Sequence, residues 1–176
     1  MIQAAKFEKV SFYQWQMSYM QRDTEEVYNS ILLPKRATIG SAGYDFFAPF
    51  DIELKAGESA KIATGIRVKI NEGWMLSLYP RSGLGFKYRL RLDNTVGIID
   101  SDYYYAENEG HIMAKITNES TENKTIFIPA GTAFMQGIFT QYGITYDDEA
   151  EGTRSGGFGS TDIHVSSSRG YSHVNF

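Results

Sequence analysis

The sequence contains no cysteine, and only three histidines occur among its 176 residues. The lack of cysteine excludes disulfides, thiolate nucleophiles and cysteine-based zinc sites. The histidines, His111, His164 and His173, are too scattered along the chain to indicate a metal triad. Oxygen atoms are therefore the ligands expected for any metal ion that the protein binds.

Long apolar runs and an excess of positive charge are also missing. The chain has no run of about 18 apolar residues and no basic N-terminal segment followed by an apolar one, so we expect neither a membrane span nor a signal peptide. The expected compartment is the cytoplasm. With 17 basic against 21 acidic residues the net charge is −4, so direct nucleic-acid binding through a general positive field is not expected.

Short apolar or alternating runs fill the chain between Ala37 and Phe139, separated by turns rich in Gly, Asn and Pro. Strands of this length and spacing predict an all-β sandwich or barrel, and the chain length suits one domain. Helical character is confined to residues 1–36. There Asp23 and Glu26 are placed to cap a short helix that ends at Pro34.

The apolar pattern ends near residue 140, so we expect the barrel domain to span residues 1–140. From Gln141 the sequence is first acidic and then rich in Gly and Ser, with almost nothing to bury, which predicts a mobile arm over residues 141–161. Residues 162–176 form a tail with no recognisable functional pattern.

Two clusters contain the groups needed to hold phosphate oxygens. In YPRSGLG, Arg81 and Ser82 stand beside a Gly-rich turn that could present backbone N–H groups, although a plain turn with a surface arginine is the alternative. In RSGGFGST, residues 154–161, the glycines accompany phosphate donors and Phe158, whose ring suits stacking on a planar ligand. The alternative there is a disordered tail. Two such clusters in one acidic domain favour a polyphosphate ligand.

The stretch LDNTVGIIDSDYYYAENEGH, residues 92–111, places Asp100 and Asp102 directly after an apolar run. We interpret residues 88–100 as a hairpin whose backbone groups near Gly97 and Ile99 could bond the edge of a planar base. Half-buried at its exit, Asp100 would be well placed to accept a proton from water. The alternative, equally compatible with the residues alone, is that both aspartates end a strand through Asx turns.

Two polar residues interrupt apolar runs. Gln136 in PAGTAFMQGIF either ties two strands together or points into a site, because a buried amide needs partners. Asp45 in GSAGYDFFAP would make either a core hydrogen bond or a water-mediated contact with a metal ion.

Five stretches, in the order SAGYDF, PRSGLG, NTVGIIDSDY, GTAFMQGIF and RSGGFGST, resemble the motifs of the trimeric dUTP pyrophosphatases (dUTPases). The resemblance spans residues 41–161. It implies a jelly-roll-like β-barrel, a homotrimer in which the arm of each subunit closes over a neighbour, and hydrolysis of dUTP to dUMP and pyrophosphate with Mg²⁺ as cofactor.

The resemblance also implies a role for each motif residue. Asp100 would be the general base that activates the water attacking the α-phosphorus, and Asp45 would approach Mg²⁺ through water. Tyr103 would lie against the deoxyribose, leaving no space for a 2′-hydroxyl, and Phe158 would stack on uracil. The other implied contacts are with phosphate oxygens for Arg81, Ser82, Gly83, Gln136 and Arg154, with uracil for Asn94, Gly97 and Ile99, and within the lid for Gly159, Ser160 and Thr161.

Two segments are longer than the family pattern. In residues 104–125, Tyr104 and Tyr105 stand beside glutamates and suit a rim that binds a regulatory protein such as a repressor, although a harmless surface loop is the alternative. Residues 10–33, rich in aromatics such as Trp15, would either pack on the barrel or face a partner. Such additions suit a phage-type member, which would act in the cytoplasm of the host cell.

Two other functions stay open. One is a nucleotide-sensing regulator that binds its partner in a dUTP-dependent way. The other is a dCTP deaminase, which shares the barrel but needs a different catalytic carboxylate and a different phosphate segment. The arm RSGGFGST argues against the deaminase.

Overall fold

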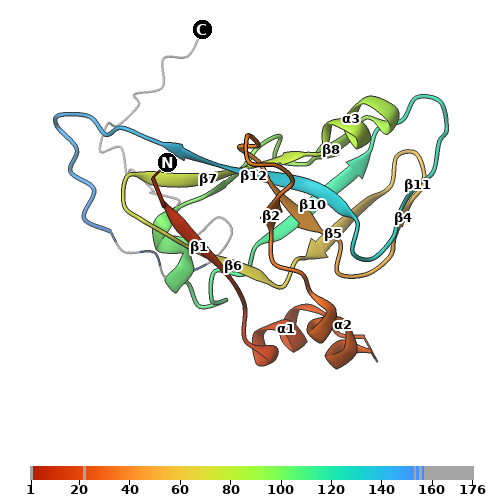
Figure 1. Ribbon diagram of the computed structural model, residues 1–176, viewed down its shortest axis with the longest axis horizontal. Coiled ribbons are helices and arrows are strands. Elements are labelled where there is room, and N and C mark those ends of the chain that lie inside the picture. The colour runs from red at the N-terminus through yellow and green to blue at the C-terminus, as the bar shows by residue number, and fades with distance from the viewer. Residues whose placement is uncertain (1, 22, 153, 155, 157–176) are drawn as a thin grey trace, which may run out of the picture.

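A computed structural model describes residues 2–21, 23–152, 154 and 156 (Figure 1). Antiparallel strands dominate this part of the chain, which confirms the all-β prediction. The strands are β1 Ala5–Lys9, β2 Lys35–Arg36, β3 Tyr44–Phe47, β4 Ile52–Leu54, β5 Ser59–Ala63, β6 Ile66–Ile70, β7 Trp74–Pro80, β8 Leu90–Leu92, β9 Gly97–Ile99, β10 Met113–Asn118, β11 Ile126–Ile128 and β12 Ala133–Gln141. The helices are α1 Phe12–Ser18, α2 Thr24–Ser30, α3 Ser82–Tyr88 and the 3-10 helix η1 Ser101–Tyr105.

The strands form a five-stranded sheet in the order β2-β3-β12-β7-β9, a three-stranded sheet β5-β10-β8, and the pairs β1-β6 and β11-β4. Alternation along each strand directs apolar side chains to a shared core. In β10, for example, Ala114 and Ile116 are buried whereas Lys115 between them is exposed. No helix in the described residues is long and apolar enough to cross a membrane.

The N-terminal segment packs on the barrel through its two short helices, which Figure 1 shows side by side. Trp15 in α1 is fully buried, and its indole N–H donates to the carbonyl of Thr24 at 2.9 Å. Its ring stacks on Tyr19 at a centroid distance of 4.9 Å. Residues 10–33 therefore contribute to the core.

The predicted short helix is confirmed as α2, but its predicted cap is wrong. Asp23 occupies the N-cap position without a side-chain capping bond, and it accepts a hydrogen bond from the hydroxyl of Tyr19 at 3.2 Å instead. A capping bond does form one helix earlier, where the Ser11 side chain accepts from the backbone N–H of Gln14.

The predicted hairpin over residues 88–100 is also wrong, because its two strands belong to different sheets. Strand β8 pairs with β10, whereas β9 pairs with β7. The intervening turn is fastened to β10, since Asp93 donates its backbone N–H to the carbonyl of Lys115 and forms an ion pair with the same residue, both at 2.9 Å. These contacts hold β8 against β10 and away from β9.

The segment expected to be an addition, residues 104–125, contains β10, which pairs with both β5 and β8. Only residues 106–112 separate η1 from this strand. Within that stretch His111 and Ile112 are fully buried, so the part that projects from the barrel is short.

Candidate functional site

The first group of expected site residues lies where β9 ends and η1 begins. Asp100 stands in extended conformation just before η1, makes no side-chain cap to it, and leaves 48% of its side chain exposed. Arg154 of the arm donates to Asp100 at 2.6 Å and to Asp102 at 3.0 Å. The two aspartates therefore share one arginine from the other end of the chain, and the Asx-turn alternative is not observed for Asp100.

Tyr103 forms the floor of this group. It is 5% exposed, and its hydroxyl donates to the carbonyl of His111 at 2.9 Å while accepting from the side-chain amide of Asn108 at 2.8 Å. Burial raises the pKa of Tyr103, although the Asn108 bond and the charge of Arg154 oppose that shift, so the phenol is neutral near pH 7. The Arg154 guanidinium lies 5.6 Å from the ring centroid.

Strand β9 brings Gly97 and Ile99 to the same place. Both residues are buried, and β9 is the last strand of its sheet among the described strands. In an antiparallel ladder alternate backbone groups point away from the neighbour, so the outer side of β9 presents N–H and C=O groups that a flat ligand can pair with. Asn94, in the preceding turn, is exposed nearby in the sequence.

Gln136, Asp45 and Arg81 form a second group at a different place. In the five-stranded sheet Gln136 of β12 stands between Asp45 of β3 and Tyr79 of β7, and Arg81 follows β7 directly. Arg81 is paired with the Asp45 carboxylate. Gly43 makes room for the glutamine, since a Cβ there would meet Gln136 Oε1 at 2.5 Å. The described contacts therefore place a cation and an amide together, as phosphate recognition requires.

Ser82 and Gly83 complete this second group from the start of α3. The structure places a helix where the sequence predicts only a Gly-rich turn, and both residues are exposed in its first turn. Backbone N–H groups at the start of a helix have no partner within the helix, so they are available to an anion. Together with Arg81 they form a donor-rich edge.

The two groups lie at opposite ends of β7. Ile99, next to Asp100, pairs with Leu76 near the start of β7, whereas Arg81 follows the last residue of that strand. The five residue steps of extended chain from Leu76 to Arg81 span about 16 Å. In Figure 1, α3 and the green turn that carries η1 accordingly lie at opposite sides of the molecule. One copy of the chain does not bring Asp100 and Arg81 together.

The other expected residues of the arm, Phe158, Gly159, Ser160 and Thr161, lie outside the described residues. Within the described part, no three His, Asp or Glu side chains gather in a way that could hold a metal ion. The single carboxylate of Asp45 is engaged by Arg81. This donor set fits a magnesium ion held mainly by phosphate oxygens and water, with at most one carboxylate behind the water.

Two residues next to Tyr103 were not expected from the sequence. Asn108 and His111 orient its hydroxyl, and both belong to the loop that follows η1. The only available signal was their position a few residues after the DSDY stretch.

Comparison with known proteins gives one consistent answer. The dUTPase family model matches residues 29–162. The deoxyuridine 5′-triphosphate nucleotidohydrolase of Lactococcus lactis subsp. lactis is 39% identical over 134 residues, which cover 74% of this chain and 88% of that protein. The corresponding protein of Finegoldia magna is 40% identical over 137 residues, covering 73% and 90%.

Solved structures agree on the fold. The dUTPase of Streptococcus mutans aligns with a TM-score of 0.62 at 33% identity, covering 79% of this chain and 97% of that one. The dUTPase of Staphylococcus bacteriophage 80alpha aligns with a TM-score of 0.61 at 20% identity, covering 88% and 100%, and is described as controlling the transfer of virulence genes. The likeness to the phage protein bears on the fold alone. The expected jelly-roll-like barrel is confirmed.

Proposed function

Because this chain belongs to the dUTPase family, we propose that it hydrolyses dUTP to dUMP and pyrophosphate, with Asp100 as the general base. The observation that supports this role best is the position of Asp100. Its carboxylate stands half-exposed at the exit of an edge strand, beside the buried Tyr103 and within 2.6 Å of Arg154. A base must be able to reach both water and the ligand, and this carboxylate can.

The geometry suggests how the ligand is read. The outer side of β9 pairs with the edge of uracil through main-chain groups, so cytosine, whose amino group reverses one donor and acceptor, leaves buried partners unpaired. Tyr103 packs flat against the deoxyribose, where a 2′-hydroxyl would collide with a ring that two hydrogen bonds hold in place. Base and sugar are therefore both selected before any chemistry takes place.

Arg154 connects ligand binding to the chemistry. Without a ligand it neutralises Asp100 and Asp102. A triphosphate is a stronger competitor for a guanidinium than two half-exposed carboxylates, so Arg154 moves to the phosphates when dUTP binds. Asp100 is then released to orient a water molecule in line with the α-phosphorus and to accept its proton.

Magnesium would be held by phosphate oxygens and water, with Asp45 as a water-mediated contact once Arg81 has turned to the phosphates. The ion would neutralise charge on the triphosphate and favour pyrophosphate as the leaving group. Arg81, Gln136 and the first turn of α3 supply the remaining donors to the phosphates.

The assembly is a homotrimer in this proposal. Asp100 and the Arg81 group must both lie near the α-phosphate, yet in one chain about 16 Å of β7 separates them. A complete site thus needs the Asp100 end of one copy and the Arg81 end of another, and a closed ring satisfies every copy in this way.

A regulatory partner is a second element of the proposal, carried by one observation. Tyr105 is 71% exposed beside the exposed Glu107, whereas Tyr104 is already engaged by Glu8 and Arg67. An exposed tyrosine next to an acidic residue is a suitable contact for another protein. The surface proposed for that partner is therefore centred on Tyr105.

The test is release of pyrophosphate from dUTP, dTTP, dCTP and UTP, with and without Mg²⁺. We expect Mg²⁺-dependent release of pyrophosphate from dUTP alone. Equal release from all four nucleotides would refute the proposed selection of uracil by β9 and of deoxyribose by Tyr103. Ammonia released from dCTP would instead indicate a deaminase.

The role of Asp100 is tested by comparing Asp100→Asn with Asp102→Asn, because each removes the negative charge of one partner of Arg154. Loss of a general base lowers kcat by about 10²- to 10⁴-fold. We expect that loss only for Asp100→Asn, with dUTP still bound. Equal losses in both variants would mean that the carboxylates serve only to anchor the arm.

A further inference from the structure

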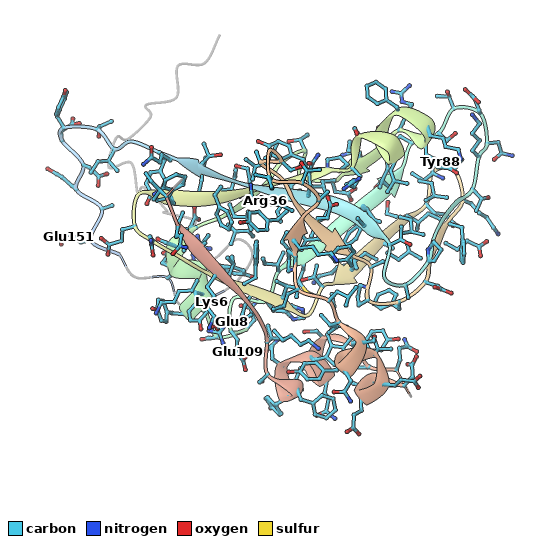
Figure 2. All side chains as sticks on the ribbon, viewed as in Figure 1. Lys6, Glu8, Arg36, Tyr88, Glu109 and Glu151 are labelled. Carbon is cyan, nitrogen blue, oxygen red and sulfur yellow. The ribbon has the colours of Figure 1, made fainter. Side chains whose placement is uncertain are left out.

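The loop after η1, residues 106–111, is fastened to the N-terminal segment by one pair of residues. Glu109 accepts the backbone N–H of Ser11 at 2.8 Å and the Ser11 hydroxyl at 2.6 Å, through its two carboxylate oxygens. Arg67 of β6 lies 3.6 Å from the same carboxylate. Figure 2 shows Glu109 close to Glu8 and Lys6, below the middle of β1. Ser11 is also the N-cap of α1, so the contact joins this loop to the start of that helix.

The backbone of this loop needs such a fastening. Glu109 has φ of 57° and Gly110 has φ of 69°, both in the left-handed region that non-glycine residues rarely adopt. A Cβ on Gly110 would meet the carbonyl oxygen of Tyr103 at 2.6 Å, so the loop folds directly back onto η1. The bonds from Ser11 offset the unfavourable conformation of Glu109.

The same loop holds the phenol of Tyr103. The residue before Glu109, Asn108, donates to the Tyr103 hydroxyl, and that hydroxyl donates to the carbonyl of His111. The His111 ring is anchored in turn, because Nε2 accepts the backbone N–H of Gly65 at 2.8 Å and Nδ1 lies 3.1 Å from the hydroxyl of Ser18 in α1. Both groups that orient the phenol therefore depend on contacts with α1.

Tyr104, the residue after Tyr103, is also held by contacts with the N-terminal strand β1 and with β6. The hydroxyl of Tyr104 donates to Glu8 of β1 at 2.7 Å, and the Arg67 guanidinium stacks on its ring at 3.6 Å. The helix η1 is thus held by β1 and β6 through Tyr104, next to Tyr103, which carries the proposed sugar-contacting ring.

We propose that Ser11 and Glu109 are positioning residues that set discrimination between deoxyribose and ribose, by holding Tyr103 through the loop 106–111. The inference rests on the proposed function, in which Tyr103 packs against the sugar. It extends that function by giving the N-terminal segment a role in specificity. A ring held within a few tenths of an ångström excludes a 2′-hydroxyl, whereas a ring that can tilt accommodates it.

The experiment compares Glu109→Ala with Glu107→Ala. Glu107 lies two positions earlier in the same loop, is exposed, and makes no hydrogen bond or ion pair within the part of the chain that the structure describes. We expect Glu109→Ala to raise KM for dUTP and to lower the ratio of kcat/KM for dUTP to that for UTP by about tenfold, the usual cost of a loosened steric contact. Glu107→Ala should match the wild type. Glu109→Gln keeps an acceptor for Ser11 and should recover part of the ratio.

A purely structural role predicts a different result. In that case Glu109→Ala would lower the unfolding temperature while KM and the dUTP-to-UTP ratio kept their wild-type values, and the inference would be overturned. If Glu109→Ala does not fold, Ser11→Ala removes the hydroxyl bond to Glu109 but keeps the backbone one, and it should also lower the dUTP-to-UTP ratio. Ser11→Thr, which keeps a hydroxyl, should restore the wild-type ratio. A wild-type protein that releases no pyrophosphate from dUTP would refute the proposed function. An active wild type with an unchanged ratio in the variants would refute only this inference.

Discussion

Complementation between two inactive variants is the sharpest consequence of the separation along β7. Asp100→Asn removes the proposed base, and Arg81→Ala removes the cation at the other end of the strand. About 16 Å of extended chain lies between them, too far for one phosphate group to touch both. Each variant alone should therefore be inactive, because every site in it lacks one required group.

Mixed assemblies should recover a defined part of the activity. If the two chains assemble at random in equal amounts, the copy that supplies Asp100 and the copy that supplies Arg81 are both intact in about one quarter of sites. The arm does not limit this fraction, since both variants carry it unchanged. Purification through both tags removes the assemblies made of one variant alone, and in each remaining mixed trimer one of the three sites has both groups intact, so the expected activity is about one third of that of the wild type per site.

The assay is pyrophosphate release by protein co-expressed from two differently tagged genes and purified through both tags in turn. Mixing Arg81→Ala with Gln136→Ala is the matched control, because both residues lie at the same end of β7. One copy supplies both residues to a given site, so every site in the mixed assembly still lacks one of them. A hybrid no more active than its parents would refute the shared site, as would equal recovery in the control pair.

The two remaining predictions concern stability. Burial, aided by Lys61 and opposed by Glu109, lowers the pKa of His111 from 6.5 to about 4, so the stability it contributes is complete above pH 6.5 and is lost as the pH falls toward 4. The free energy of unfolding, measured with urea, should fall by about 3 kcal/mol over this range, and His111→Gln should remove most of this pH dependence. If the variant shows the same dependence of unfolding free energy on pH as the wild type, other groups cause it. Trp15→Ala should cost about 3–5 kcal/mol and lower Tm by roughly 6–20 °C, because the side chain is fully buried. Trp15→Phe, which loses mainly the bond to Thr24, should cost much less, and equal costs would mean that packing contributes little.

Much of the fold could be predicted from the sequence, since its signal is local. Strands such as β4 and β10 show buried and exposed residues in alternation, and the sequence has the same period. Strand β1 was missed because charged residues occupy three of its five positions. Helix α3 was missed because Gly83 and Gly85 disfavour a helix, and it forms through packing of Leu84 and Tyr88 on the core. The cap of α1, Ser11 followed by Gln14, was a signal that the sequence did carry.

The candidate site was predictable in its residue types but not in its layout. Motif spacing pointed to Asp100 and Arg81, whereas their places at opposite ends of β7 depend on the register between distant segments, which no local pattern encodes. The expected hairpin failed for the same reason, because Asp93 binds a strand more than twenty residues away. Asn108 and His111 support Tyr103 from a loop in which Glu109 and Gly110 adopt left-handed backbone conformations. No alternation of apolar and polar residues in the sequence predicts such a loop.

The edge strand β9 has a consequence for how such a protein can change over generations. Its outer side presents amide and carbonyl groups, which are identical whichever codon is used, so point substitutions exchange the side chains of Gly97 or Ile99 without rewriting the donors and acceptors. Phosphate binding, by contrast, depends on side chains such as those of Arg81 and Gln136, which a single substitution can remove. Drift should therefore erode phosphate binding gradually, while a change of preferred nucleobase requires rerouting the polypeptide itself.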